Sequence, residues 1–211
     1  MNVDTDIEEI SRQFEPLKAK QRIARAYQLF GDDLILSTSF GLTAGVMLKL
    51  ATDVYPDIRV LTVRHGYESP RTLELADHFV HLFNLNLKVY EAPKLLIPDD
   101  DSPEFDAFKR RVKVEPFRMA LESEKPRAWL SGVMREETLE RKTFDYVMPK
   151  KGTLAIYPIL DWTQIHAEEY CLAHALPLNT SYYDPSKGSQ QNKECGLHLG
   201  DIGSSWTSSG L

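Results

Sequence analysis

The chain has 211 residues, of which 42% are apolar and 27% are charged, proportions typical of globular proteins. Its net charge of −6 argues against general binding to a nucleic-acid backbone, although a few lysines and arginines suffice to hold a mononucleotide. The apolar stretches are too short to cross a bilayer, and the acidic start does not resemble a secretion leader. We therefore expect a cytoplasmic protein that binds neither membrane nor nucleic acid.

Helices and strands are predicted to alternate along most of the chain. Residues 5–30 read as two amphipathic helical stretches interrupted at Pro16 and closed by Gly31. The later predicted elements, in order, are a strand at 34–36, a helix at 42–51, a strand at 58–63, a helix from Ser69-Pro70 to about residue 84, a strand at 87–91, a helix near 116–122, strands at 128–133 and 153–160, and a helix that Asp161 caps and that runs to about residue 175. Such alternation predicts a mostly parallel sheet with helices on both faces and ligands at the carboxyl ends of the strands.

Two segments lack this pattern. Residues 93–106 include Pro98-Asp99-Asp100-Asp101-Ser102-Pro103 and are predicted to form a solvated acidic loop without chemistry. The last part of the chain is polar and rich in Gly, Ser and Asn, which is typical of a mobile segment. We therefore expect a single α/β nucleotide-binding domain with N-terminal helices at residues 1–178 and a mobile C-terminal tail at residues 179–211.

A small-residue loop follows the first predicted strand and precedes a helix. Ser37 and Ser39 offer hydroxyl donors, the helix start offers backbone N–H groups, and Gly41 permits close approach of a ligand. These are the requirements of a phosphate site. The spacing matches neither the Walker loop nor the G-x-G-x-x-G fingerprint, so a plain turn stays an alternative interpretation.

The two cysteines differ in their surroundings. Cys171 lies in a helical run and is expected to pack in the core. Cys195 lies in the polar segment Lys193-Glu194-Cys195-Gly196-Leu197-His198, where a lysine and a histidine would favour the thiolate and a glutamate would oppose it. Cys195 is therefore either a reactive thiol or an incidental cysteine. A lone reactive thiol requires an external thiol to resolve its adduct.

Four segments in this order resemble the phosphoadenylyl-sulfate (PAPS) reductase family, also called sulfonucleotide reductases. They are Ser37-Thr38-Ser39-Phe40-Gly41, Val114-Glu115-Pro116, Tyr157-Pro158-Ile159-Leu160-Asp161-Trp162, and Lys193-Glu194-Cys195-Gly196-Leu197-His198. The likeness runs from about residue 30 to residue 200. Its most specific part is the stretch Glu194-Cys195-Gly196-Leu197-His198.

The resemblance implies an adenine nucleotide α-hydrolase-like fold and an enzyme of sulfate assimilation and cysteine biosynthesis. In such enzymes a tail cysteine, here Cys195, attacks the sulfate sulfur, an S-sulfocysteine forms, and thioredoxin or glutaredoxin releases sulfite. Lys113 would face the sulfate, and a homodimer is possible in the family. The resemblance assigns substrate binding to Ser37, Ser39, Phe40, Gly41, Gly66, Lys113, Gly132, Arg141, Lys193 and His198.

Departures from the family pattern bear on the substrate. The chain lacks the Cys-Cys and Cys-x-x-Cys pairs of relatives with an iron–sulfur cluster, so no metal or cluster is expected and 3′-phosphoadenylyl sulfate is the favoured substrate. The family's Asp-Thr-Gly-Tyr loop reads Arg64-His65-Gly66-Tyr67, and Asp184-Pro185-Ser186-Lys187-Gly188 replaces a Gly-Asp loop. The alternatives are cluster-free reduction of adenylyl sulfate, an ATP-pyrophosphatase-type nucleotidyl transferase, and a non-catalytic nucleotide-binding relative.

Overall fold

The computed structural model describes residues 3–150, 152–189, 191 and 197–198. Two N-terminal helices, α1 (Val3–Phe14) and α2 (Ala19–Phe30), flank the predicted break at Pro16. The second helix ends at Gly31, whose φ of 53° lies in the left-handed region that favours glycine. The predicted break and end are therefore confirmed.

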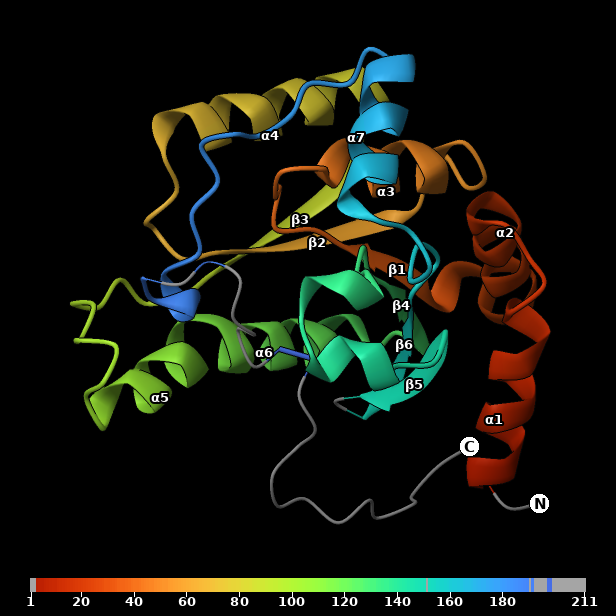
Figure 1. Ribbon diagram of the computed structural model, residues 1–211, viewed down its shortest axis with the longest axis horizontal. Coiled ribbons are helices and arrows are strands. Elements are labelled where there is room, and N and C mark those ends of the chain that lie inside the picture. Colours follow the sequence, from red (N-terminus) through yellow and green to blue (C-terminus); the bar gives the residue numbers. More distant parts are fainter. Residues whose placement is uncertain (1–2, 151, 190, 192–196, 199–211) are drawn as a thin grey trace.

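A six-stranded sheet forms the centre of the fold (Figure 1). The strands are β1 (Leu34–Ser37), β2 (Arg59–Arg64), β3 (Asn86–Glu91), β4 (Ala128–Leu130), β5 (Val147–Lys150) and β6 (Thr153–Ile156). Their spatial order is β3-β2-β1-β4-β6-β5, and all neighbours are parallel except β5, which runs antiparallel to β6. This arrangement confirms the mostly parallel α/β sheet and adds the edge strand β5, which the sequence did not predict.

Helices cover both faces of the sheet. Figure 1 shows α3 (Ala44–Thr52), α4 (Pro70–Phe83) and α7 (Gln164–Ala173) on one side of the strands, with α5 (Glu104–Lys109) and α6 (Glu115–Glu124) on the other. A π turn at Arg110–Val114 joins α5 to α6, and short 3₁₀ turns lie at Gly31–Asp33, Arg135–Glu137, Glu140–Thr143 and Pro185–Lys187. No described helix is long and apolar enough to cross a membrane.

The central strands are buried on both faces. Leu34, Ile35 and Leu36 of β1 and Trp129 and Leu130 of β4 are all 0% exposed. Continuous apolar runs of this kind are expected in the middle of a parallel sheet, where helices pack on each face. The rigid centre of the sheet therefore lies directly beneath the loops that follow β1 and β4.

The predicted cap of the last helix is wrong. Helix α7 begins three residues later than Asp161, and Thr163 is its N-cap, with Oγ1 accepting a hydrogen bond from the backbone N–H of His166 at 3.2 Å. The Asp161 carboxylate instead accepts two bonds from Arg22, at 2.6 and 3.0 Å. The Asp161 carboxylate therefore binds the buried guanidinium of Arg22 in α2 and does not cap α7.

The chain after α7 makes hydrogen bonds to the acidic loop and to the loop after β1. Asp100 Oδ2 accepts hydrogen bonds from the backbone N–H and the hydroxyl of Ser189, at 2.7 and 2.5 Å. Asn179 is 1% exposed and donates from its side chain to the carbonyl of Phe40 at 2.6 Å. These contacts were not expected from a solvated loop and a polar tail. The division at residue 178 and the mobility of the tail stay predictions.

Candidate functional site

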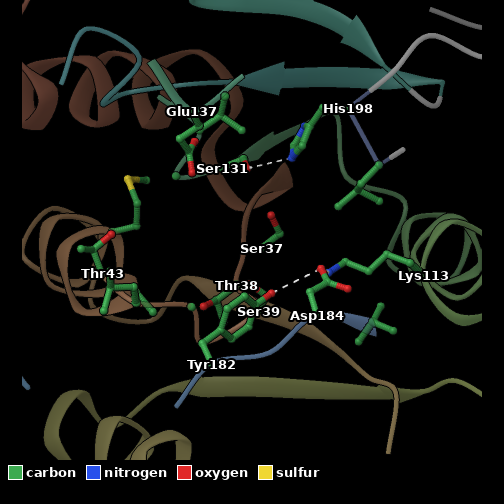
Figure 2. Close-up of a pocket in the computed structure, with 18 of the residues that line it drawn as sticks. Ser37, Thr38, Ser39, Thr43, Lys113, Ser131, Glu137, Tyr182, Asp184 and His198 are labelled. Carbon is green, nitrogen blue, oxygen red and sulfur yellow. Dashed lines mark hydrogen bonds and ion pairs between the residues drawn. The ribbon is translucent and has the colours of Figure 1, made fainter. Parts of the chain in front are cut away.

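A cavity of about 290 Å³ lies where β1, β2, β4 and β6 end. This is the edge at which parallel α/β sheets bind ligands, and the volume is near the lower end of the range for small-molecule sites. Figure 2 shows polar side chains from separate segments around the cavity, namely Ser37, Thr38, Ser39, Thr43, Lys113, Ser131, Glu137, Tyr182, Asp184 and His198.

The loop after β1 forms one wall. Ser37, Ser39 and Gly41 line the cavity, and Ser37 Oγ donates to the carbonyl of Leu130 at 3.3 Å. Phe40 adopts a φ of 51°, unusual for a side chain with a Cβ, and its ring is buried in the core at 5% exposure. The loop thus presents hydroxyls to the cavity and anchors itself through Phe40, which does not line that cavity.

Lys113 reaches the opposite wall from the π turn between α5 and α6. It is 8% exposed and forms an ion pair with Asp184, which is 1% exposed. Asp184 is the N-cap of the 3₁₀ turn Pro185–Lys187, in the segment that stands in place of the Gly-Asp loop, and both Lys113 and Asp184 line the cavity. The expected cation is therefore present at the cavity, with a carboxylate already bound to it.

Further hydrogen bonds fix the Asp184 carboxylate. Its Oδ1 accepts from the backbone N–H and the hydroxyl of Ser186, at 3.0 and 2.5 Å. Burial raises the pKa of Asp184, but the charge and hydrogen bond of Lys113 and the bonds from Ser186 outweigh burial and hold the pKa at about 2. Asp184 is therefore an anion at any physiological pH.

A second cation lines the cavity from the 3₁₀ turn Glu140–Thr143, which lies between β4 and β5 in the sequence. Arg141 is 7% exposed and pairs with Glu137, which also accepts the backbone N–H of Met134 at 2.8 Å. Gly132 lines the same wall, and a Cβ there would lie 3.0 Å from Cγ of Met47. The two ends of the predicted Gly132 to Arg141 stretch therefore meet at the cavity.

His198 lines the cavity and contacts residues at the ends of β4 and β6. It is 5% exposed, its Nδ1 lies 3.3 Å from the Tyr157 hydroxyl, and its Nε2 lies 3.5 Å from Oγ of Ser131. Its ring also stacks on the indole of Trp129. His198 and the preceding Leu197 both line the cavity.

Four predicted substrate-binding or catalytic positions are not brought to the cavity by the described structure, and Phe40, described above, is one of them. Gly66 is exposed and lines neither that cavity nor the small neighbouring one, although its φ of 78° requires glycine. Cys195 and Lys193 lie outside the described residues. Their proposed roles therefore stay predictions.

The other cysteine is unsuited to nucleophilic chemistry. Cys171 is 0% exposed in the core, as the sequence predicted. Burial, together with the nearby Glu168 carboxylate, raises the pKa of its thiol to about 11. Among the residues that the structure describes, no group of three or more His, Cys, Asp or Glu side chains is placed to hold a metal ion.

Several residues at the cavity were not singled out from the sequence. They are Thr43, Ser131, Glu137, Gln164, Tyr182, Asp184 and Lys187. For Asp184 a local indication existed, because Asp followed by Pro and Ser is typical of a turn in which the carboxylate accepts the N–H two residues later. That bond is the one from Ser186.

Comparisons with known proteins agree in sequence and in fold. A family model described as the phosphoadenosine phosphosulfate reductase domain matches residues 33–185. The phosphoadenosine 5′-phosphosulfate reductase of Synechococcus sp. is 37% identical over 179 residues, which cover 80% of this chain and 77% of that protein.

Two solved structures share the architecture. Phosphoadenylyl-sulfate reductase from Candida auris, in a phosphate complex, has a TM-score of 0.69 and 20% identity, covering 82% of this chain and 87% of that chain. FMN adenylyltransferase from Candida glabrata, with FAD and inorganic pyrophosphate, has a TM-score of 0.54 and 12% identity, covering 76% and 57%. At these identities the structures show the fold alone, which confirms the predicted adenine nucleotide α-hydrolase-like class.

Proposed function

Since this chain belongs to the phosphoadenosine phosphosulfate reductase family, we propose that it reduces 3′-phosphoadenylyl sulfate to sulfite and adenosine 3′,5′-bisphosphate. Reduction of a sulfonucleotide in sulfate assimilation is the activity that the family supports. The choice of the 3′-phosphorylated substrate, the thiol chemistry and the covalent intermediate are our proposals. The substrate choice follows from the absence of the cysteine pairs that carry a cluster in other relatives.

One observation carries the proposal. Leu197 and His198, the second and third residues after Cys195, line the polar cavity. Because two residues of extended chain span at most about 7 Å, the covalent chain keeps the Cα of Cys195 within about 7 Å of that of Leu197. We propose that this short connection brings the thiol to the cavity that would hold the nucleotide.

The proposed reaction has three steps. The Cys195 thiolate attacks the sulfate sulfur, an Sγ–S bond forms, and the bond between sulfur and the bridging oxygen breaks, so that the electron pair leaves on the nucleotide phosphate. A donor thiolate then attacks Sγ, and sulfite leaves with the electron pair of the Sγ–S bond. The second donor thiol resolves the mixed disulfide. Sulfur is reduced and the dithiol donor, thioredoxin or glutaredoxin, is oxidised.

The residues at the cavity suit the binding of a phosphosulfate. Hydroxyls of Ser37 and Ser39 and the start of α3 provide donors for anionic oxygens, and Lys113 and Arg141 provide positive charge. A good leaving group needs little acid–base assistance, so positioning and anion stabilisation should account for most of the rate. We propose the same substrate-binding role for Phe40, Gly41, Gly66, Gly132, Lys193 and His198.

The two cysteines provide a matched test. Sulfite release from 3′-phosphoadenylyl sulfate with excess thioredoxin should vanish in Cys195→Ser, whereas Cys171→Ser should retain it because Cys171 is buried with a raised pKa. Sulfite formation by Cys195→Ser at the parent rate would refute the proposal. Running adenylyl sulfate in parallel identifies the substrate, and faster turnover of adenylyl sulfate would reverse the substrate choice.

The remaining proposals concern cofactors and partners. Two cysteines cannot supply the four thiolates of an iron–sulfur cluster, so we propose that the enzyme needs no cluster and takes its electrons from the external donor. We also propose a cytoplasmic location and a possible homodimer. Activity measured with thioredoxin and with glutaredoxin separately, and the mass of the enzyme in solution, test the donor and the assembly.

A further inference from the structure

The Asp184 carboxylate occupies a binding position on the cation that the substrate would use. Lys113 and Asp184 are both buried, both line the cavity, and are joined by an ion pair. The charge on Lys113 is therefore offset before any ligand arrives. An anion that approaches Lys113 meets the field of the carboxylate as well as that of the ammonium.

Hydrogen bonds from residues other than Lys113 fix the Asp184 side chain and backbone. Its Oδ1 accepts both the N–H and the hydroxyl of Ser186, at 3.0 and 2.5 Å, while Oδ2 pairs with Lys113. Its backbone N–H donates to Oε1 of Gln191 at 3.0 Å, and its carbonyl accepts from Nε2 of Gln191 at 3.1 Å. These bonds keep the carboxylate in place, so a ligand must share the ammonium with it.

We propose that Asp184 is a built-in counterion that competes with the sulfate end of the sulfonucleotide for Lys113 and so weakens substrate binding in the ground state. This inference rests on the proposed function and names a residue that tunes affinity at the same site. Tight binding of substrate and transition state alike does not raise the turnover rate. A fixed competitor for Lys113 limits such unproductive affinity.

The sign of the effect makes the inference testable. Replacement of a buried and bonded residue normally weakens binding, because it loosens the site. Removal of a competing charge strengthens it. Asp184→Asn keeps the size of the side chain and an acceptor for Ser186 but removes the charge, so affinity should rise on the order of tenfold.

The measurement is calorimetric binding of 3′-phosphoadenylyl sulfate to the full chain carrying Cys195→Ser, which prevents turnover. The same titration is made with Asp184→Asn added, and with adenosine 3′,5′-bisphosphate, which lacks the sulfate. Two charge-preserving controls, Asp184→Glu and Ser186→Ala, should show no gain. Asp184→Ser is a second uncharged variant, and the same gain is expected from it, so a folding defect in one variant does not decide the outcome.

Tighter binding of the sulfonucleotide in the uncharged variants, with a smaller gain for the bisphosphate, supports the inference. Unchanged or weaker sulfonucleotide binding by a folded uncharged variant overturns it while leaving the proposed function standing. An equal gain for both nucleotides overturns the assignment to the sulfate end. Failure of the Cys195→Ser parent to bind any sulfonucleotide would overturn the proposed function, and this inference with it.

Discussion

The imidazole of His198 stacks on the indole of Trp129, with ring centroids 5.3 Å apart and planes 20° from parallel. Trp129 is 0% exposed in the middle of β4, so the contact joins His198 to the rigid centre of the sheet. His198 follows Cys195 by three residues. The stack is therefore a fixed point for the segment that carries the proposed nucleophile.

Loss of this fixed point should slow chemistry more than it weakens binding. We predict that His198→Ala lowers kcat on the order of tenfold to a hundredfold, because misplacement of a nucleophile by about 1 Å is that costly. His198→Phe, which keeps a stacking ring, should recover part of the rate. Steady-state kinetics with the exposed His81→Ala as control checks this. Equal rates in His198→Ala and the parent would rule out the anchoring role.

Arg22 should be a main contributor to stability. Its guanidinium is 2% exposed and donates to the carbonyls of Phe14 and Pro158, at 3.0 and 2.9 Å, and to the carboxylate of Asp161. Arg22→Ala leaves these acceptors without their donor, and we predict a loss of about 3 kcal/mol in the free energy of unfolding.

Urea unfolding measures this loss, and Arg25→Ala is the matched control on the same helix. Arg25 makes an exposed hydrogen bond to Gln13 at 3.0 Å, so its replacement should change stability by less than about 0.5 kcal/mol. Similar losses in the two variants would show that the buried bonds of Arg22 are not what stabilises the fold.

The Lys113–Asp184 pair predicts a pH dependence of stability. The folded-state pKa of Asp184 is about 2, below the value of an unfolded aspartate. A carboxylate whose pKa is lowered by folding stabilises the fold at pH values above its unfolded pKa of about 3.9. This stabilisation, about 2–3 kcal/mol, is lost as the pH falls toward 2. Asp184→Asn should therefore destabilise the protein strongly at pH 6 and about half as strongly at pH 3. Urea unfolding of both proteins over this range tests it, and a constant difference would contradict it.

Gly132 should be intolerant of a side chain. A Cβ there would lie 3.0 Å from Met47, which also lines the cavity, and overpacking of this kind costs about 1–3 kcal/mol. We predict that Gly132→Ala weakens nucleotide affinity roughly tenfold. Gly152→Ala is the control, because Gly152 has a φ of 75° but nothing within 4 Å of its Cβ position. Gly152→Ala should reduce stability without changing affinity, and equal affinities in both variants would refute the prediction.

Local patterns predicted most of the fold. Ser69 was identified as the cap of α4 from its sequence neighbours alone, and its Oγ accepts the N–H of Thr72 at 3.1 Å. Asp161 was assigned wrongly because its partner Arg22 lies 139 residues earlier, where no local pattern indicates it. Strand β5 was missed because it is short, contains Pro149 and forms only by pairing with β6.

The candidate site also has parts that local sequence predicts and parts that depend on residues distant in the sequence. The position of the loop at the cavity was predictable, because Ser37 ends a buried strand, Gly41 lies in the turn after it, and both residues line the cavity. The burial of Asp184 was not predictable from local composition, because its polar neighbours in the sequence are typical of a solvated tail. Its carboxylate pairs with Lys113, which lies 71 residues earlier in the chain.

The role of Cys195 is tested most directly by the intact mass of the reduced enzyme after mixing with 3′-phosphoadenylyl sulfate in the absence of any thiol donor. We predict a gain of one sulfonate, carried by the peptide that contains Cys195 and absent from Cys195→Ser. Because no donor is present, the adduct should persist until thioredoxin is added and sulfite appears. Nucleotide binding without any adduct would show that Cys195 does not attack the sulfate sulfur.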